Sequence, residues 1–184
     1  MKFSNIQNSV LGALIFLMAV PVLAQKTKMV GGAAMYPTKN IVENAVNSQD
    51  HTTLVAAVKA ADLVETLQSA GPFTVFAPVN SAFEKLPDGT VDNLLMAENK
   101  PTLQAVLTYH VVAGKLSAKD ISRAIKKGKG KATFKTVNGA AIFATQKGKD
   151  IIISDAKGSM AMVTIADVNQ SNGVIHVVDT VLLP

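Results

Sequence analysis

The sequence of 184 residues contains no cysteine and no tryptophan. Without cysteine, the chain cannot have a thiolate nucleophile, a disulfide, an iron–sulfur cluster or a cysteine-rich zinc site. Its stability must therefore come from packing alone. Because 48% of the residues are hydrophobic and 17% are charged, the chain is long enough and apolar enough to bury a core.

Common catalytic motifs are missing as well. The sequence contains neither G-x-S-x-G nor H-E-x-x-H, and no glycine-rich phosphate loop follows a strand into a helix. Asp150 and Asp155 fall in turns, where solvated carboxylates are the ordinary explanation. We expect His51, which follows Asp50 before a helix start, to be exposed, and two adjacent side chains rarely converge on one metal ion. The sequence therefore predicts no catalytic residue, no metal site and no cofactor.

The beginning of the chain has the pattern of a secretory signal peptide. Met1 and Lys2 precede an apolar run, Val10 to Ala24, that is shorter than the roughly 20 residues needed to span a bilayer. Val22-Leu23-Ala24 matches the small-residue rule at a cleavage site. We predict a signal peptide over residues 1–24, cleaved after Ala24, and a secreted chain, periplasmic or extracellular, without an integral membrane segment.

The remaining chain is predicted to be helical first and strand-rich afterwards. Residues 25–39 indicate an extended, partly mobile leader, and residues 40–184 indicate a single domain. One buried strand, residues 73–78, interrupts the helical half. In the second half, β-branched runs alternate with turns, including a hairpin turn at Asn138-Gly139. This order predicts an α+β domain with a largely antiparallel sheet.

Several helix starts are marked by polar residues that can cap the first turn. Asn40 precedes a helical segment. Capping-box spacings, a polar residue followed three positions later by an acidic one, begin at Asp62, Ser81 and Ser117. Each predicts the first turn of a short helix.

Positive charge is concentrated in one segment. Residues 115–149 contain ten basic residues and Asp120 alone as an acid, which gives +9, whereas the rest of the chain after the signal peptide sums to −5. Such a face can meet anionic polysaccharide, lipid headgroups or nucleic acid, but a solvated surface that guards strand edges is the favoured explanation. Phe134 and Phe143 are expected to face inward, so we expect no nucleic-acid binding, because aromatic stacking platforms are missing. The basic patch comprises Lys126, Lys127, Lys129 and Lys131.

Two histidines adjoin predicted strands. His110 lies between a helix ending near Thr108 and a short strand, where a neutral imidazole can bridge unpaired groups. His176 alternates with Val174 and Val178 on one strand face. For both we favour a structural role, because a buried imidazole without partners would be costly.

Three segments, taken together and in order, resemble one known family. They are FTVFAPVNSAF (residues 73–83), LTYHVVAGKLSAKDI (residues 107–121) and NGVIHVVDTVLLP (residues 172–184). They are similar to the first conserved box, the Tyr-His motif and the second conserved box of the fasciclin-type domain, FAS1. The resemblance implies a β-sheet wedge with several short helices packed at one end, in a small single-domain secreted bacterial member. It also implies that His110 pairs with Asn80.

The resemblance further implies a role in adhesion. It marks Tyr109, His110, Val111 and Val112 as candidate interaction residues, and Asn80, His110 and His176 as a structural polar tie. The leading hypothesis is a secreted, non-enzymatic adhesion module, monomeric, that contacts a protein or surface polysaccharide of the cell surface, matrix or envelope. The alternative is a soluble carrier of a small apolar or lipid-like ligand, held between the sheet and the helices.

Overall fold

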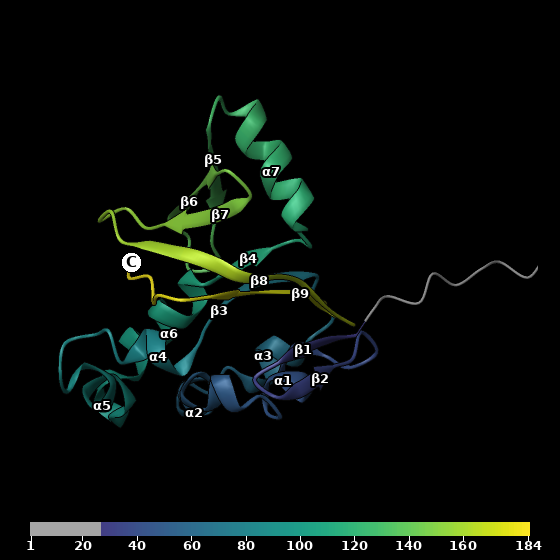
Figure 1. Cartoon of the computed structure of the whole chain (residues 1–184). Helices are drawn as coiled ribbons and strands as arrows, with labels where there is room; N and C mark the ends of the chain where they lie inside the picture. The colour runs from purple at the N-terminus through teal and green to yellow at the C-terminus, as the bar shows by residue number, and fades with distance from the viewer. Residues whose placement is uncertain (1–26) are drawn as a thin grey trace, which may run out of the picture.

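The computed structural model describes residues 27–184 (Figure 1). The predicted signal peptide and its cleavage site after Ala24 lie outside these residues. A seven-stranded sheet forms the centre, in the order β4-β3-β9-β8-β7-β6-β5. All neighbouring strands are antiparallel except β3 and β9, which are parallel. The strands of this sheet are β3 (Phe73–Pro78), β4 (Val111–Ala113), β5 (Lys131–Lys135), β6 (Ala141–Lys147), β7 (Asp150–Ser154), β8 (Met160–Gln170) and β9 (Gly173–Val178).

Short helices gather at one end of the wedge, and a single helix packs at the other (Figure 1). The α+β fold with a largely antiparallel sheet and helices at one end is therefore confirmed. The exception is α7 (Ala118–Lys127), which packs against β5 and β6. The helices of the opposite end, here called the helical base, are α1 (Ile41–Ala45), η1 (Gln49–His51), α2 (Thr52–Ala60), α3 (Val64–Gln68), α4 (Asn80–Phe83), α5 (Thr90–Leu95), η2 (Ala97–Asn99) and α6 (Lys100–Tyr109).

The central strands β3 and β9 are buried on both faces. On β3, Val75 packs into a core cluster beneath the helical base, whereas Phe76 packs into a second cluster beneath α7. On β9, Ile175 belongs to the first cluster and Val178 to the second. Strands covered on both sides have nearly continuous apolar sequences, as these two do.

The long strand β8 joins the two parts of the wedge. Its first residues pair with β7, and its later residues pair with β9. The pairing with β9 shifts register twice, between Val163 and Ile165 and between Ile165 and Val168. Such irregularities bend a strand and increase its twist. The bend allows β8 to pair with β7 by its first residues and with β9 by its later ones.

Two of the predicted caps form, and two do not. Asn40 and Ser117 each close a capping box, with Glu43 and Asp120 respectively. The box expected from Asp62 is wrong, because Asp62 has a φ of +54°, which reverses the chain after α2 and excludes the extended backbone of a cap. The box expected from Ser81 is also wrong, because α4 already begins one residue earlier.

The segment expected to be a mobile leader folds onto the domain instead. Its strands β1 (Lys28–Val30) and β2 (Ala33–Met35) form a separate antiparallel hairpin. Val30 and Met35 are buried in the core cluster beneath the helical base. The prediction failed because the hairpin depends on tertiary contacts rather than on its Gly- and Ala-containing sequence. The folded part of the chain therefore begins before the predicted domain boundary at residue 40.

Met35→Ala tests whether the hairpin contributes to the core. Met35 is 3% exposed, and deletion of a buried methionine costs about 2–5 kcal/mol of the free energy of unfolding. Met29 lies in the same hairpin but is 61% exposed, so Met29→Ala is the matched control and should cost less than about 0.5 kcal/mol. Urea denaturation measures both, and equal stability of the two variants would show that the hairpin does not belong to the core.

Candidate functional site

The Tyr-His segment lies inside the molecule. It joins the end of α6 to β4, and the exposed fractions of Tyr109 and His110 are 0% and 3%. Val111 and Val112 are also buried, one in each core cluster. The prediction that these four residues form an interaction surface is wrong, because strand β4 pairs with β3 and has both faces covered. The Tyr109 hydroxyl donates a hydrogen bond to the Ala141 carbonyl at 2.9 Å.

His110 joins the end of α6 to the C-terminal tail, residues 179–184, which follows β9. The Leu182 amide donates to Nε2 at 3.0 Å, so Nε2 carries no proton and Nδ1 carries the proton of the neutral ring. Nδ1 lies 2.9 Å from the Val106 carbonyl, to which it therefore donates. Burial lowers the pKa of His110, an effect that the Val106 carbonyl and the Asp155 carboxylate only partly offset. The ring is thus neutral and fully hydrogen-bonded.

Asn80 does not contact His110, contrary to prediction. Its Oδ1 accepts from the Thr53 amide at 3.1 Å, and its Nδ2 donates to the Gln49 carbonyl at 2.8 Å. Asn80 thereby attaches α4 to the start of α2 within the helical base. The predicted pairing failed because both polar ends of the Asn80 amide and both ring nitrogens of His110 are bonded elsewhere.

His176 lies on β9, at the centre of the sheet. Its Nδ1 accepts from the Asp167 amide at 3.3 Å, and its Nε2 lies 2.8 Å from the Leu116 carbonyl. The ring is also stacked on Phe76, with 5.7 Å between ring centroids. Burial lowers the pKa of His176, so the ring is neutral, with its proton on Nε2. His176 joins β8 and β9 to the segment that precedes α7.

Asp155 is a polar tie that the sequence did not reveal. It lies in a turn, as expected, but its carboxylate is buried rather than solvated. Oδ1 accepts from the amides of Lys157 and Ser159, both at 2.9 Å, and Oδ2 accepts from the Leu183 amide at 3.2 Å. Asp155 and His110 thus hold consecutive residues of the C-terminal tail. An aspartate at a turn predicts the local bonds, but nothing in the sequence predicts the bond to the tail.

His51 is buried, although we expected it to be exposed. Only 3% of its surface is accessible, and Nδ1 lies 2.9 Å from the Ser48 hydroxyl. Nε2 has no hydrogen-bond partner among the residues that the structure describes. Burial lowers the pKa of the ring, and the Ala77 carbonyl and Asp50 carboxylate oppose this only in part. The expectation failed because η1 turns the ring beneath the helical base instead of toward solvent.

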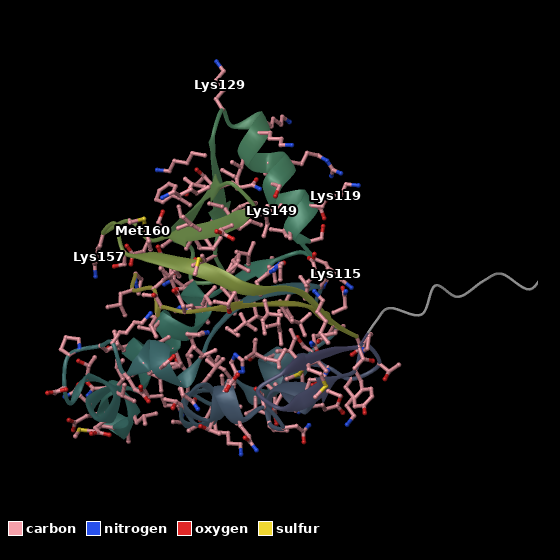
Figure 2. The ribbon with its side chains drawn as sticks, viewed as in Figure 1. Lys115, Lys119, Lys129, Lys149, Lys157 and Met160 are labelled. Atoms are coloured by element: carbon pink, nitrogen blue, oxygen red, sulfur yellow. The ribbon has the colours of Figure 1, made fainter. Side chains whose placement is uncertain are left out.

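The four lysines of the basic patch are exposed at the end of the wedge opposite the helical base. Lys129 lies at the tip of this end, and Lys115 and Lys119 follow the helix that descends from it (Figure 2). Phe143 lies on the outer sheet face, where its ring centroid is 3.8 Å from Lys131 Nζ. The inward orientation expected for Phe143 is therefore wrong, whereas Phe134 packs against the cluster beneath α7.

An apolar cavity of about 80 Å³ lies between the helical base and the sheet. Within residues 27–184, no group of three or more His, Asp or Glu side chains is arranged to hold a metal ion. Over the same residues, no helix is long and apolar enough to cross a membrane.

A wedge-shaped sheet, a buried Tyr-His segment and a C-terminal tail fixed by hydrogen bonds characterise this α+β domain. The Fasciclin domain family matches residues 49–184, and the chain belongs to this family. It is 45% identical over 182 residues to Protein sll1483 of Synechocystis sp., covering 99% of this chain and 94% of that protein.

Two further similarities are informative. The chain is 32% identical over 160 residues to the cell surface glycolipoprotein MPB83 of Mycobacterium bovis, covering 84% of this chain and 64% of that protein. A FAS1 domain pair from the insect cell adhesion molecule Fasciclin I has the same fold, with a TM-score of 0.70 and 19% sequence identity. That match covers 79% of this chain and 51% of the insect chain.

His110→Ala tests the structural role of the Tyr-His segment. The change removes the ring and leaves its two partners, the Leu182 amide and the Val106 carbonyl, buried without these hydrogen bonds. We expect the free energy of unfolding to fall by about 2–4 kcal/mol, from a lost buried polar network and a new cavity. Lys59→Ala on the surface is the control and should change it by less than about 0.5 kcal/mol. An unchanged thermal melt of the His110 variant would contradict the structural role.

The three buried histidines also predict how stability depends on pH. Their folded pKa values are lowered, so below about pH 6.5 the unfolded chain binds protons that the folded chain does not. Stability is therefore complete above about pH 6.5 and is lost as the pH falls, by up to about 1.4 kcal/mol per pH unit for each histidine that stays neutral. Urea denaturation between about pH 7.5 and pH 5 measures this slope. A flat profile over that range would show that the rings are protonated in the folded chain.

Proposed function

We propose that the chain is an exported, non-catalytic adhesion module that binds an anionic surface polysaccharide through its basic end. The observation that carries the proposal is the clustering of exposed lysines on one end of a rigid wedge. The names of two similar proteins, a cell surface glycolipoprotein and a cell adhesion molecule, agree with a role at a surface. The module acts as a monomer with its signal peptide removed.

The charge distribution gives the molecule an orientation toward such a partner. The segment of residues 115–149, which forms α7, β5 and β6, carries +9. The helical base, residues 41–109, contains eight acidic and three basic residues, a net of −5. An anionic polymer is attracted to the first end and repelled by the second, so the field of the whole molecule steers the basic end to the surface.

The lysines are arranged for contact with a polymer rather than for internal ion pairs. In the middle of α7, Arg123 is paired with Asp120 at 2.8 Å, but the lysines at the end of the helix have no carboxylate within ion-pair distance among the described residues. Gly128 and Gly130 flank Lys129, which has a φ of +56°, so the turn projects the lysines into solvent. Exposed ammonium groups on long stems can follow the anionic groups of a flexible chain.

A non-catalytic role is supported by how the candidate residues for chemistry are used. The polar side-chain atoms of three buried residues are hydrogen-bonded to backbone groups: His110, His176 and Asp155. None of these side chains is placed in an open cleft beside a second ionisable group, as acid–base catalysis requires.

Removing three lysine charges tests the proposal. We expect the variant K126Q/K127Q/K129Q to bind dextran sulfate beads at least about tenfold more weakly than the unaltered chain, with binding that falls as salt increases. The control variant K39Q/K59Q/K100Q removes the same charge from the other part of the molecule and should bind as the unaltered chain does. Neutral dextran beads should retain neither protein.

Two results would contradict the proposal. One is equal loss of binding in both lysine variants, which would indicate a general charge effect without a site. The other is retention on dextran sulfate that does not respond to salt or to the three substitutions at the basic end.

A further inference from the structure

Strands β5 to β8 have one face beneath α7 and one face toward solvent. On the face beneath α7, Ala144, Ile153 and Ala161 are fully buried. Successive side chains of a strand point to opposite faces, so the residues between these point away from α7. On this second face, here called the outer face, Met160 is 65% exposed and Met162 is 42% exposed. Two large apolar side chains therefore project into solvent from one strand.

The strand register places four apolar side chains of the outer face next to one another. Ile152 of β7 is directly opposite Met162 of β8, and Ser154 lies between Met160 of β8 and Phe143 of β6. Side chains that are directly opposite stand on the same face, with about 4.5–5.5 Å between their Cβ atoms. The apolar stripe consists of Phe143, Ile152, Met160 and Met162.

Lysines surround the apolar stripe. Lys131 Nζ lies 3.8 Å from the centroid of the Phe143 ring. Lys157, in the turn before β8, and Met160 both lie at the edge of the wedge (Figure 2). Two more lysines belong to the same face of β5 and β6. The exposed lysines around the stripe are Lys131, Lys135, Lys147 and Lys157.

Two carboxylates near the stripe are offset by lysines. Asp150 is directly opposite Lys147 in the ladder of β6 and β7. The Asp179 carboxylate accepts from the Met162 amide at 2.8 Å, and its second oxygen lies 3.9 Å from Lys85 Nζ. The outer face thus keeps a surplus of positive charge around an apolar centre.

Anionic lipid fits both features of this face. Lysine ammonium groups attract anionic headgroups, and their long stems can extend past apolar side chains to reach them. Apolar side chains at the same level enter the boundary between headgroups and acyl chains. A polysaccharide can contact the lysines but has no hydrocarbon layer for the two methionines. A protein partner is less favoured, because protein interfaces are anchored mainly by aromatic side chains and arginines in pockets.

We propose that the outer face docks on a membrane surface rich in anionic lipids, with the apolar stripe at the boundary between headgroups and acyl chains. The lysines around the stripe contact the headgroups, so the attachment is peripheral. This inference goes beyond the binding of a polysaccharide by the basic end. The two proposals are tested on different residues and can fail independently.

Sedimentation with lipid vesicles measures the contact. The mature chain, residues 25–184, is used, because the apolar run before it would bind lipid by itself. It should bind vesicles of phosphatidylcholine and phosphatidylglycerol in equal parts, with an affinity that falls as salt increases. Vesicles of phosphatidylcholine alone should bind it at least about tenfold more weakly.

Replacing the two methionines separates the apolar contribution from the charge. The variant M160Q/M162Q should bind the anionic vesicles at least about tenfold more weakly, because amide side chains gain little from the lipid. M29Q/M96Q is the matched control, since these methionines are 61% and 48% exposed but lie in β1 and before η2. The control should bind the vesicles as the unaltered mature chain does, and both variants should keep their retention on dextran sulfate.

A single fluorescent label shows whether the stripe enters the lipid. Because the chain has no cysteine, M160C and M29C each contain one thiol, which can be labelled with nitrobenzoxadiazole. Its emission rises and shifts to the blue in an apolar medium. Anionic vesicles should produce this shift with the label at residue 160 and leave the label at residue 29 unchanged.

Three results would overturn the proposal. One is the absence of binding to anionic vesicles by a chain that is still retained on dextran sulfate, which leaves the proposal for the basic end intact. Another is equal vesicle binding by M160Q/M162Q and M29Q/M96Q. The third is bound vesicles that leave the label at residue 160 unchanged, which would show that lysines alone contact the lipid.

Discussion

The hydrogen bonds of His110 are the constraint on which the two ends of the domain depend. Its ring joins the Val106 carbonyl of α6 to the Leu182 amide of the C-terminal tail, and its own carbonyl accepts from the Phe76 amide of β3 at 2.9 Å. One residue thus holds a helix, the central strand and the last residues of the chain. Because α6 belongs to the helical base and Leu182 packs beneath α7, the two core clusters are fixed relative to one another.

The fold could be predicted from the sequence because its signals are local. The alternation of β-branched residues after residue 131, the helical periodicity before Tyr109 and the Asn138-Gly139 turn all indicate structure within a few residues. Ser117 and Asp120 meet in a capping box because they are three residues apart. Asp62 shows the limit of such signals, because the reversal of the chain after α2 is set by packing and removes the cap that the spacing predicts.

The site was predicted less well because its contacts join residues far apart in the sequence. An asparagine followed by glycine, as at Asn172, indicates only a turn, but its side chain accepts from the Ile41 amide at 3.1 Å and donates to the Leu67 carbonyl at 2.7 Å. The same holds for the bonds of Asp155 to the tail and of Asn80 to η1. Burial of Tyr109 could not be inferred either, because a tyrosine beside a turn suits a surface and a core equally well. The exposure of the lysines, in contrast, could be predicted from the sequence, since charged side chains without partners remain in solvent.

A scaffold held by internal hydrogen bonds leaves the lysines of its basic end exposed, and His110 must belong to that scaffold. The most direct test is the state of its ring in solution, measured by long-range ¹H–¹⁵N NMR as a function of pH. The structure predicts a neutral ring with the proton on Nδ1, whose pKa burial holds below that of an exposed histidine. A ring protonated on Nε2, or one that titrates near about pH 6.5 like an exposed histidine, would contradict it.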